Sequence, residues 1–219
     1  YIVRNQNGVA GRISGMNSHG FNGNYGVPGG ATAVGTYRGR ILNVDVGDAA
    51  VAGSGSAIGN CIRLVHNRDA SSAVIVGNTL LRQCPNGRGI EGTSRDAGAS
   101  FTSTSGLDLQ VLNSNVNPND TSGFPLAAII SQAITGAGGG NRARNDFRNN
   151  VVPVGTSFDL QPAFLIAHEG GTGDCQVVDP PPANANATAV LTSPENANTG
   201  SASGSAGCSL IPGPLITPP

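Results

Sequence analysis

The stretch VIVGNTLL, residues 74–81, is an apolar strand that stops at a Gly-Asn pair and resumes at once as a second apolar run. Asn tolerates left-handed backbone geometry and bonds neighbouring main chain, so the pair predicts a tight corner. The same order of strand, Asn and apolar residue recurs in ILNVDV (41–46), LQVLNSNV (109–116) and DFRNNVV (146–152). The pattern predicts a chain that turns after every short strand.

An internal repeat connects these stretches. Taking Asp45, Asn78, Asn115 and Asn150 as equivalent gives steps of 33, 37 and 35 residues. Two or three short strands per irregular coil are typical of a parallel β-helix, in which each coil supplies hydrogen bonds and packing for the next. Second strands recur between the first ones: IGNCIRLV (58–65), GRGIEG (87–92), LAAIIS (126–131) and AFLIAH (163–168). We therefore expect an all-β, right-handed parallel β-helix.

The composition agrees with a thin-layered solenoid. Of 219 residues, 33 are Gly and 38% are apolar, but aromatic residues make up only 4%. Such a chain favours many turns and a core of Ala, Val, Ile and Leu. Charged residues are 11%, the formal net charge is −1, and all 12 basic residues are Arg. This balance indicates neither nucleic acid nor a membrane surface as a partner.

Three regions differ in composition. Residues 1–40 are Gly-rich and predict weak coils, residues 41–178 carry the repeats, and residues 179–219 are rich in Pro, Ala, Asn, Ser and Thr. We expect this last region to be an extended tail held by a disulfide bond. No run approaches the 18 apolar residues of a membrane span. The strand-like opening YIVRN suggests a piece of a longer secreted precursor.

The inward-facing residues follow from the strand pattern. Apolar side chains should point into the solenoid from each strand and stack on those of the next coil. We expect the following residues to be mostly inward: Ile62, Leu64, Val74, Val76, Leu80, Ile90, Leu109, Val111, Ile129, Val151 and Leu165.

The four cysteines predict disulfide bonds. They show no CxxC spacing and no nearby His that would suit zinc, so an oxidising compartment is favoured. A bond between Cys175 and Cys208 would close a loop of about 30 residues and stabilise the tail by about 3 to 4 kcal/mol in the chain-entropy estimate. Cys61 and Cys84, about one short coil apart, are expected to form the second bond.

The order of the repeats resembles a known group of proteins. The segments GNCIRLV, VIVGNTLLRQ, GRGIEG, SGFPLAAIIS and RNNVVPVGTSFDL, followed by the closing ATAVLTSPENANTGSASGSAGCSLIPGPLITPP, resemble the C-terminal part of large bacterial cell-surface proteins with right-handed parallel β-helix repeats. The resemblance covers most of residues 41–219. It implies a secreted or surface-displayed, adhesin-like protein, and members of such families mostly lack a demonstrated reaction.

Two clusters are candidates for catalysis, because β-helices also host lyases and glycosidases that use paired carboxylates or Arg. One is Asp45 and Asp48 in NVDVGD, which we interpret as a turn-capping pair. The second combines Arg88, Glu91, Arg95 and Asp96, which we interpret as solvated ion pairs. We expect no catalytic residues, no cofactor and no metal.

The remaining polar signals are weak. His19, His66 and His168 lie far apart in sequence, and NPNDTSG (117–123) lacks the spacing of a calcium loop. Asn119 and Asn186 each begin a glycosylation sequon.

Self-association is a further expectation, because a β-helix has two open ends and we find no convincing amphipathic helix at either terminus. The apolar residues expected to take part are Tyr1, Ile2, Val3, Leu210, Ile211, Leu215 and Ile216. Three functions remain: a non-catalytic extracellular structural module or filament subunit, a polysaccharide-processing enzyme, and a glycan- or calcium-binding module. The supply of stacking strands and turns favours the first, with homo-oligomers or surface glycans as partners.

Overall fold

The computed structural model of the chain describes eleven segments. They are residues 2–4, 11–13, 21–25, 35–67, 70–95, 106–118, 126–134, 140–153, 162–169, 174–204 and 208–213.

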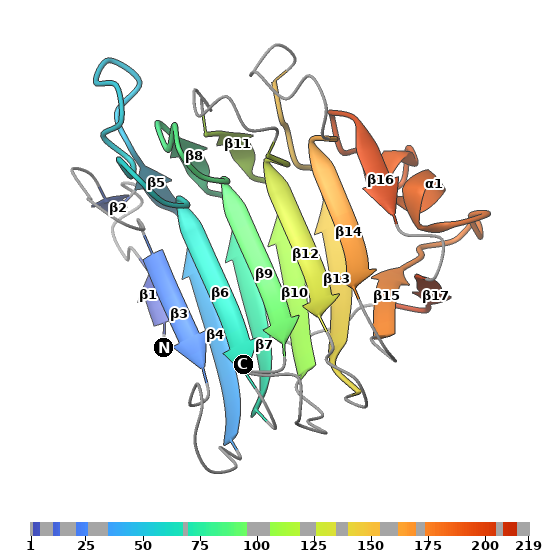
Figure 1. Ribbon diagram of the computed structural model, residues 1–219. Helices are drawn as coiled ribbons and strands as arrows, with labels where there is room; N and C mark the ends of the chain where they lie inside the picture. The colour runs from blue at the N-terminus through green and yellow to red at the C-terminus, as the bar shows by residue number, and fades with distance from the viewer. Residues whose placement is uncertain are drawn as a thin grey trace.

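The described strands form three parallel sheets that wind as a right-handed β-helix (Figure 1). In Figure 1 the chain descends in a first sheet at the front (sheet C), rises behind it in a second (sheet A) and crosses the top in a third (sheet B), while advancing from left to right. This confirms the expected fold class. Sheet A contains β1 (Ile2–Arg4), β4 (Gly35–Leu42), β7 (Ala70–Gly77), β10 (Gly106–Leu112), β13 (Arg142–Arg148), β15 (Asp174–Val178) and β17 (Ser209–Ile211). Sheet B contains β2 (Gly11–Ile13), β5 (Val44–Val46), β8 (Leu80–Arg82) and β11 (Asn115–Asn117). Sheet C contains β3 (Phe21–Tyr25), β6 (Ile62–Asn67), β9 (Ile90–Arg95), β12 (Ile129–Ile134), β14 (Phe164–Glu169) and β16 (Ala202–Gly204).

Each sheet stacks one strand per coil in register. In sheet C, Ile62 pairs with Ile90, Ile90 with Ile129, and Ile129 with Phe164, and all four side chains are buried. Because apolar side chains of consecutive coils stack on one another, water is excluded from the interior although each coil adds only a thin layer to the core. The core is therefore the narrow column enclosed by the three sheets, as the composition predicted.

Eight of the eleven residues expected to be inward are buried, and three are not. Leu80 and Leu165 are partly exposed, and Val151 is 39% exposed. Their neighbours Leu81, Ile166 and Val152 face the core instead. A shift of one residue moves a strand's side chains to the opposite face, which explains all three errors.

Left-handed residues form a line along the corner between sheets A and B. Asn43, Asn78, Asn113, Asn149 and Ala197 have φ values of 56°, 51°, 50°, 54° and 49°. The backbone N–H of each of the first four Asn residues donates to the next coil, and Asn78, for example, bonds Leu112 O at 3.0 Å. The predicted corner at Asn78 is confirmed. The alignment of Asn78 with Asp45, Asn115 and Asn150 was wrong, because Asp45 and Asn115 pair with Leu80.

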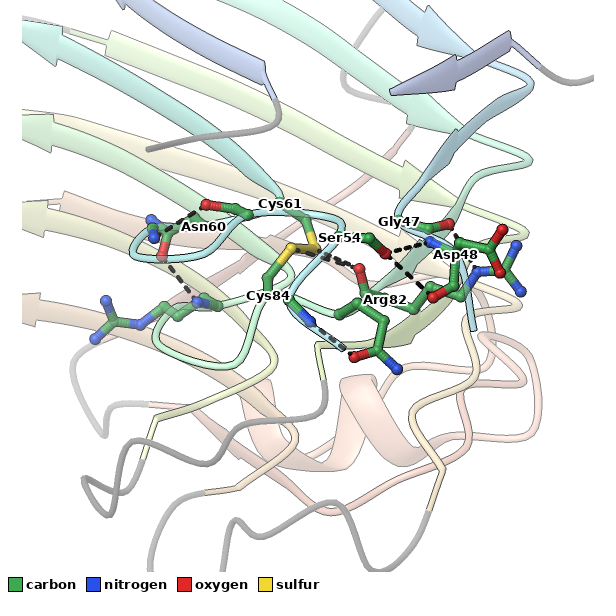
Figure 2. The surroundings of a disulfide bond; sticks show 12 residues. Gly47, Asp48, Ser54, Asn60, Cys61, Arg82 and Cys84 are labelled. Atoms are coloured by element: carbon green, nitrogen blue, oxygen red, sulfur yellow. Dashed lines mark hydrogen bonds between the residues drawn. A yellow bond between two sulfur atoms is a disulfide. The ribbon is translucent and has the colours of Figure 1, made fainter. Parts of the chain in front are cut away.

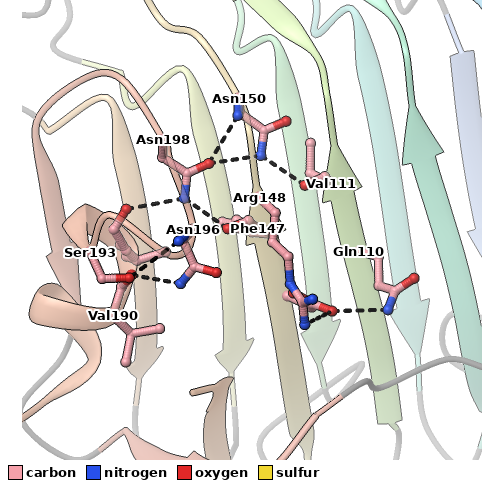
Figure 3. A network of polar contacts seen from close by, with 11 residues as sticks. Gln110, Val111, Phe147, Arg148, Asn150, Val190, Ser193, Asn196 and Asn198 are labelled. Atoms are coloured by element: carbon pink, nitrogen blue, oxygen red, sulfur yellow. Dashed lines mark hydrogen bonds and ion pairs between the residues drawn. The ribbon is translucent and has the colours of Figure 1, made fainter. Parts of the chain in front are cut away.

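Polar side chains stack just inside this corner, where Figure 3 shows the last members. Thr79 Oγ1 donates to Ser114 Oγ at 3.0 Å, and the Ser114 N–H donates to Asn150 Oδ1 at 3.1 Å. Asn150 Nδ2 donates to Val111 O, and to Asn198 Oδ1 in the following coil. Each coil thus satisfies polar groups of its neighbour, which fixes the register in a region with few strand residues.

The last coil contains the helix α1 (Ala187–Thr192), which the sequence analysis did not expect. Asn186 Oδ1 accepts from the N–H of Ala189 at 2.9 Å and caps the helix. Ala187, Val190 and Leu191 are buried in the core cluster beside β16 (Figure 1). The expectation that no amphipathic helix lies near this end was therefore wrong. The Pro/Ala/Ser-rich region is not simply an extended tail, since β16 and β17 continue sheets C and A.

Candidate functional site

Two stacked loops project between sheets B and C around the Cys61–Cys84 disulfide bond (Figure 2). Residues 47–60 lie in one coil and residues 83–89 in the next. The N–H groups of Gly55 and Ser56 donate to Gln83 O at 2.9 and 3.1 Å, and Asn86 Nδ2 donates to Ala57 O. Backbone and covalent bonds thus brace one loop on the other.

The acidic residues of NVDVGD, Asp45 and Asp48, lie at the base of these loops and make different kinds of contact. Asp45 forms an ion pair with Arg82 across 3.6 Å. Asp48 Oδ1 accepts from the N–H of Ala50, and the N–H of Asp48 donates to Ser54 Oγ at 2.7 Å. Asp48 therefore caps a turn, as expected, whereas Asp45 neutralises an arginine of the next coil.

The second predicted cluster is dispersed. Glu91 pairs with Arg63 across 3.4 Å, accepts from Asn60 Nδ2, and accepts from Thr93 Oγ1 at 3.3 Å. Arg88 is held by its backbone, whose N–H donates to Asn60 Oδ1. Arg95 ends β9, and Asp96 lies outside the described residues. Glu91 is thus a bonded carboxylate on the outer face of sheet C, with partners that the sequence did not indicate.

His66 is buried inside the solenoid. A hydrogen bond of 2.6 Å joins its Nε2 to Ser72 Oγ at the passage from β6 to β7. Burial lowers the pKa of His66 to about 4, so the imidazole is neutral at pH 7. His19 lies outside the described residues, and the side chain of His168 is not described.

The outer face of sheet A carries a charged network that sequence reasoning missed. On β13, Arg142, Arg144, Asp146 and Arg148 alternate with the inward Ala143, Asn145 and Phe147. This alternation in RARNDFR was a readable signal, because side chains two apart on a strand share a face. The sequence analysis used the end of that stretch only as a repeat marker.

Two arginines of β13 are fixed by carboxylates. Arg144 Nε donates to Asp108 Oδ1 at 2.6 Å, and its Nη2 donates to Asp108 Oδ2. Arg148 Nε and Nη2 donate to the two oxygens of Asp146 at 2.6 and 3.0 Å, and Gln110 Nε2 also donates to Asp146 (Figure 3). The hydrogen bond to Asp108 raises the pKa of Arg144 above its usual value. Burial raises the pKa of Asp146, although Arg148 and Gln110 partly offset this.

Both predicted disulfide bonds are present. Cys61 bonds Cys84, and Cys175 bonds Cys208. Cys61, Cys84 and Cys175 are fully buried, while Cys208 is partly exposed. Each bond connects two consecutive coils, so unwinding one coil from the next is restrained.

The residues expected to mediate self-association are only partly described. Ile2 and Val3 lie in β1 without described side chains, and Tyr1, Leu215 and Ile216 fall outside the described residues. Leu210 packs against the chain's own core from β17, which pairs with β15. Ile211, on the opposite face of β17, is partly exposed.

Other candidates are placed as follows. Among the described residues, no group of three or more His, Cys, Asp or Glu is arranged to hold a metal ion. Asn117 and Pro118 are the only described residues of the calcium candidate, and the sequon at Asn119 lies outside the described part. Asn186 is exposed and caps α1. The short helix α1 is far from long enough to cross a membrane, and the described part of the chain contains no other candidate span.

Comparison with protein-family models, with curated proteins and with solved structures finds no match for this chain. The geometry alone therefore carries the functional argument. The two disulfide bonds and the finding on membrane spans are compatible with an extracellular protein.

Proposed function

We propose that this chain is a non-catalytic structural module outside the cell, either a segment of a secreted or surface-displayed adhesin-like protein or the subunit of a filament. The observation that carries the proposal is the pair of disulfide bonds, each of which joins two consecutive coils, with three of the four cysteines fully buried. Such bonds form and persist in oxidising compartments. A solenoid cross-linked at two levels suits a rigid element that must survive outside the cell.

The outer carboxylates support the same proposal. Asp45, Glu91, Asp108 and Asp146 each pair with an arginine of their own chain. A carboxylate whose oxygens already face a guanidinium is poorly placed to accept a proton from a substrate. The ion pairs of Asp45, Glu91 and Asp108 join neighbouring coils, and that of Asp146 lies within β13.

Localisation tests the proposal directly. Intact source cells are probed with antibody to the chain, and the chain is alkylated without reduction before its mass is measured. We expect surface staining or secreted chain, with no alkylated cysteine. A cytosolic chain with four free thiols contradicts the proposal, and so does release of new reducing ends from a panel of polysaccharides incubated with the purified protein.

Assembly is the second part of the proposal. β17 is the last described strand of sheet A, and an edge strand is a template for strand addition by a second copy. A charge on an edge strand discourages such pairing, so Ile211→Lys should lower the particle mass measured by sedimentation. Ile58→Lys is the matched control, because Ile58 is 64% exposed and lies in the 47–60 loop. Equal masses for the native chain and Ile211→Lys contradict a role for this edge.

A further inference from the structure

Arginine side chains lie on the outer face of sheet A. The strand register aligns residues of successive coils in rows that run along the solenoid axis. Register places Arg38 of β4 in the same row as Ala73, Asp108 and Arg144, and Arg40 in the row of Ile75, Gln110 and Asp146. Neighbouring strands lie about 4.8 Å apart, so β4 and β13 are about 14 Å apart across three strand spacings. The arginines therefore form two groups separated along the solenoid axis.

The β13 guanidinium groups are oriented before any ligand arrives. Arg144 and Arg148 each use Nε and Nη2 for an aspartate, which leaves Nη1 on the far side of the planar group. Their side chains remain 29% and 33% exposed. A guanidinium held in this way loses little conformational entropy when it binds a second anion.

The face has more positive than negative charge. Arg38, Arg40, Arg142, Arg144 and Arg148 outnumber the outward Asp108, Asp146 and Asp174 on the described strands of sheet A. Arg38 is exposed, and Arg142 is 39% exposed and reaches Asp108 only across 3.7 Å. The whole chain is slightly acidic, with a net charge of −1. Positive charge is thus concentrated on one side of an otherwise weakly charged protein.

We propose that the outer face of sheet A binds a linear anionic polysaccharide that lies along the solenoid axis from β4 to β13. Arginine forks recognise carboxylate and sulfate groups through paired N–H donors, and a flat sheet gives a long chain repeated contacts at regular spacing. Ser71 and Gln176, both partly exposed in the rows of Arg142 and Arg144, supply polar groups for sugar hydroxyls. This inference rests on the proposed extracellular role and names its partner.

Binding is measured by calorimetry with the full chain and three probes: polygalacturonate, heparin and neutral dextran. We expect both anionic polymers to bind and dextran not to bind, with affinity falling as salt rises because the contacts are ionic. Stronger binding of polygalacturonate identifies carboxylate as the preferred anion, and stronger binding of heparin identifies sulfate.

Variants locate the surface. Arg38→Gln and Arg142→Gln should each weaken binding about tenfold, the loss expected for one charge-assisted contact. The melting temperature should fall by no more than about 2 °C, because exposed ion pairs contribute little to stability. Arg63→Gln is the matched control, because it removes the same charge from sheet C. Equal weakening by all three variants, or salt-independent binding of dextran, overturns the inference.

The outcomes separate this inference from the proposed function. A chain that is surface-exposed and disulfide-bonded but binds neither polyanion overturns the ligand and leaves the structural role intact. A chain that binds polyanions through Arg38 and Arg142 but is cytosolic with free thiols contradicts the structural role and supports the binding face.

Discussion

Ala197 occupies the corner position that Asn149 holds one coil earlier, with φ of 49° against 54°. Left-handed geometry costs an L-residue other than Gly or Asn about 1 to 2 kcal/mol, and Asn reduces this cost by local hydrogen bonding. The last coil therefore departs from the asparagine rule that holds at Asn43, Asn78 and Asn113.

Placing Asn at this last corner position should stabilise the protein. We expect Ala197→Asn to raise the free energy of unfolding by about 0.5 to 1 kcal/mol, which is a rise of about 2 °C in melting temperature for a chain of this size. Calorimetry checks the value. Ala52→Asn is the control, because Ala52 is exposed and is not among the described residues with positive φ. An equal gain in both variants would contradict the role of the backbone angle.

The stacked Asn150 should be among the least replaceable polar residues. Asn150→Ala removes the partners of the Ser114 N–H and of Val111 O, both buried, and one of the two donors to Asn198 Oδ1. Unsatisfied buried groups make the expected loss about 3 kcal/mol in a denaturant titration. Asn86→Ala, which deletes one exposed hydrogen bond to Ala57 O, should cost less than about 1 kcal/mol. Similar losses at the two sites would show that the stack does not act as a network.

The free energy of unfolding should decrease as the pH is lowered, because of His66. Its pKa is about 4 when folded and 6.5 when unfolded, so the unfolded state takes up the proton first as pH drops. The neutral ring contributes its full stability above pH 6.5, and that contribution is lost as pH falls towards 4, by about 3 kcal/mol in total. Urea titrations at pH 7.5 and 4.5 measure the loss. His66→Gln should reduce the difference in unfolding free energy between these two pH values. An unchanged difference would mean that His66 is not buried in its neutral form.

Gly92 should not accept a side chain. A Cβ at this position would lie 2.7 Å from Leu109 Cδ2 and 3.1 Å from Leu107 Cδ2 across the narrow core. We expect Gly92→Ala to destabilise by about 1 to 3 kcal/mol through overpacking. Leu109→Val in the same chain should recover part of the loss, because it removes a methylene from the closest neighbour. A neutral Gly92→Ala would indicate that the core has spare room there.

The sequence by itself determined the short strands, the asparagine corner at Asn78 and most of the inward residues of the longer strands. Strands such as β10 are long enough to show which alternate positions are apolar, so Leu109 and Val111 were assigned correctly. Both cysteine pairs were expected from the sequence, although only the separation of 33 residues between Cys175 and Cys208 matches the repeat, and the 23 residues between Cys61 and Cys84 fall short of it. Local chain chemistry is sufficient for these features.

Only the tertiary structure decided the rest. The bridge at Val151 and the three-residue strand β8 are too short to show an alternation, and β14 is apolar at Phe164, Leu165 and Ile166 alike. The partners of Glu91 and Arg144 lie about one coil away, at Arg63 and Asp108. Such pairs depend on the register between coils, and the loops that separate paired strands differ in length from coil to coil, so the sequence alone does not give this register.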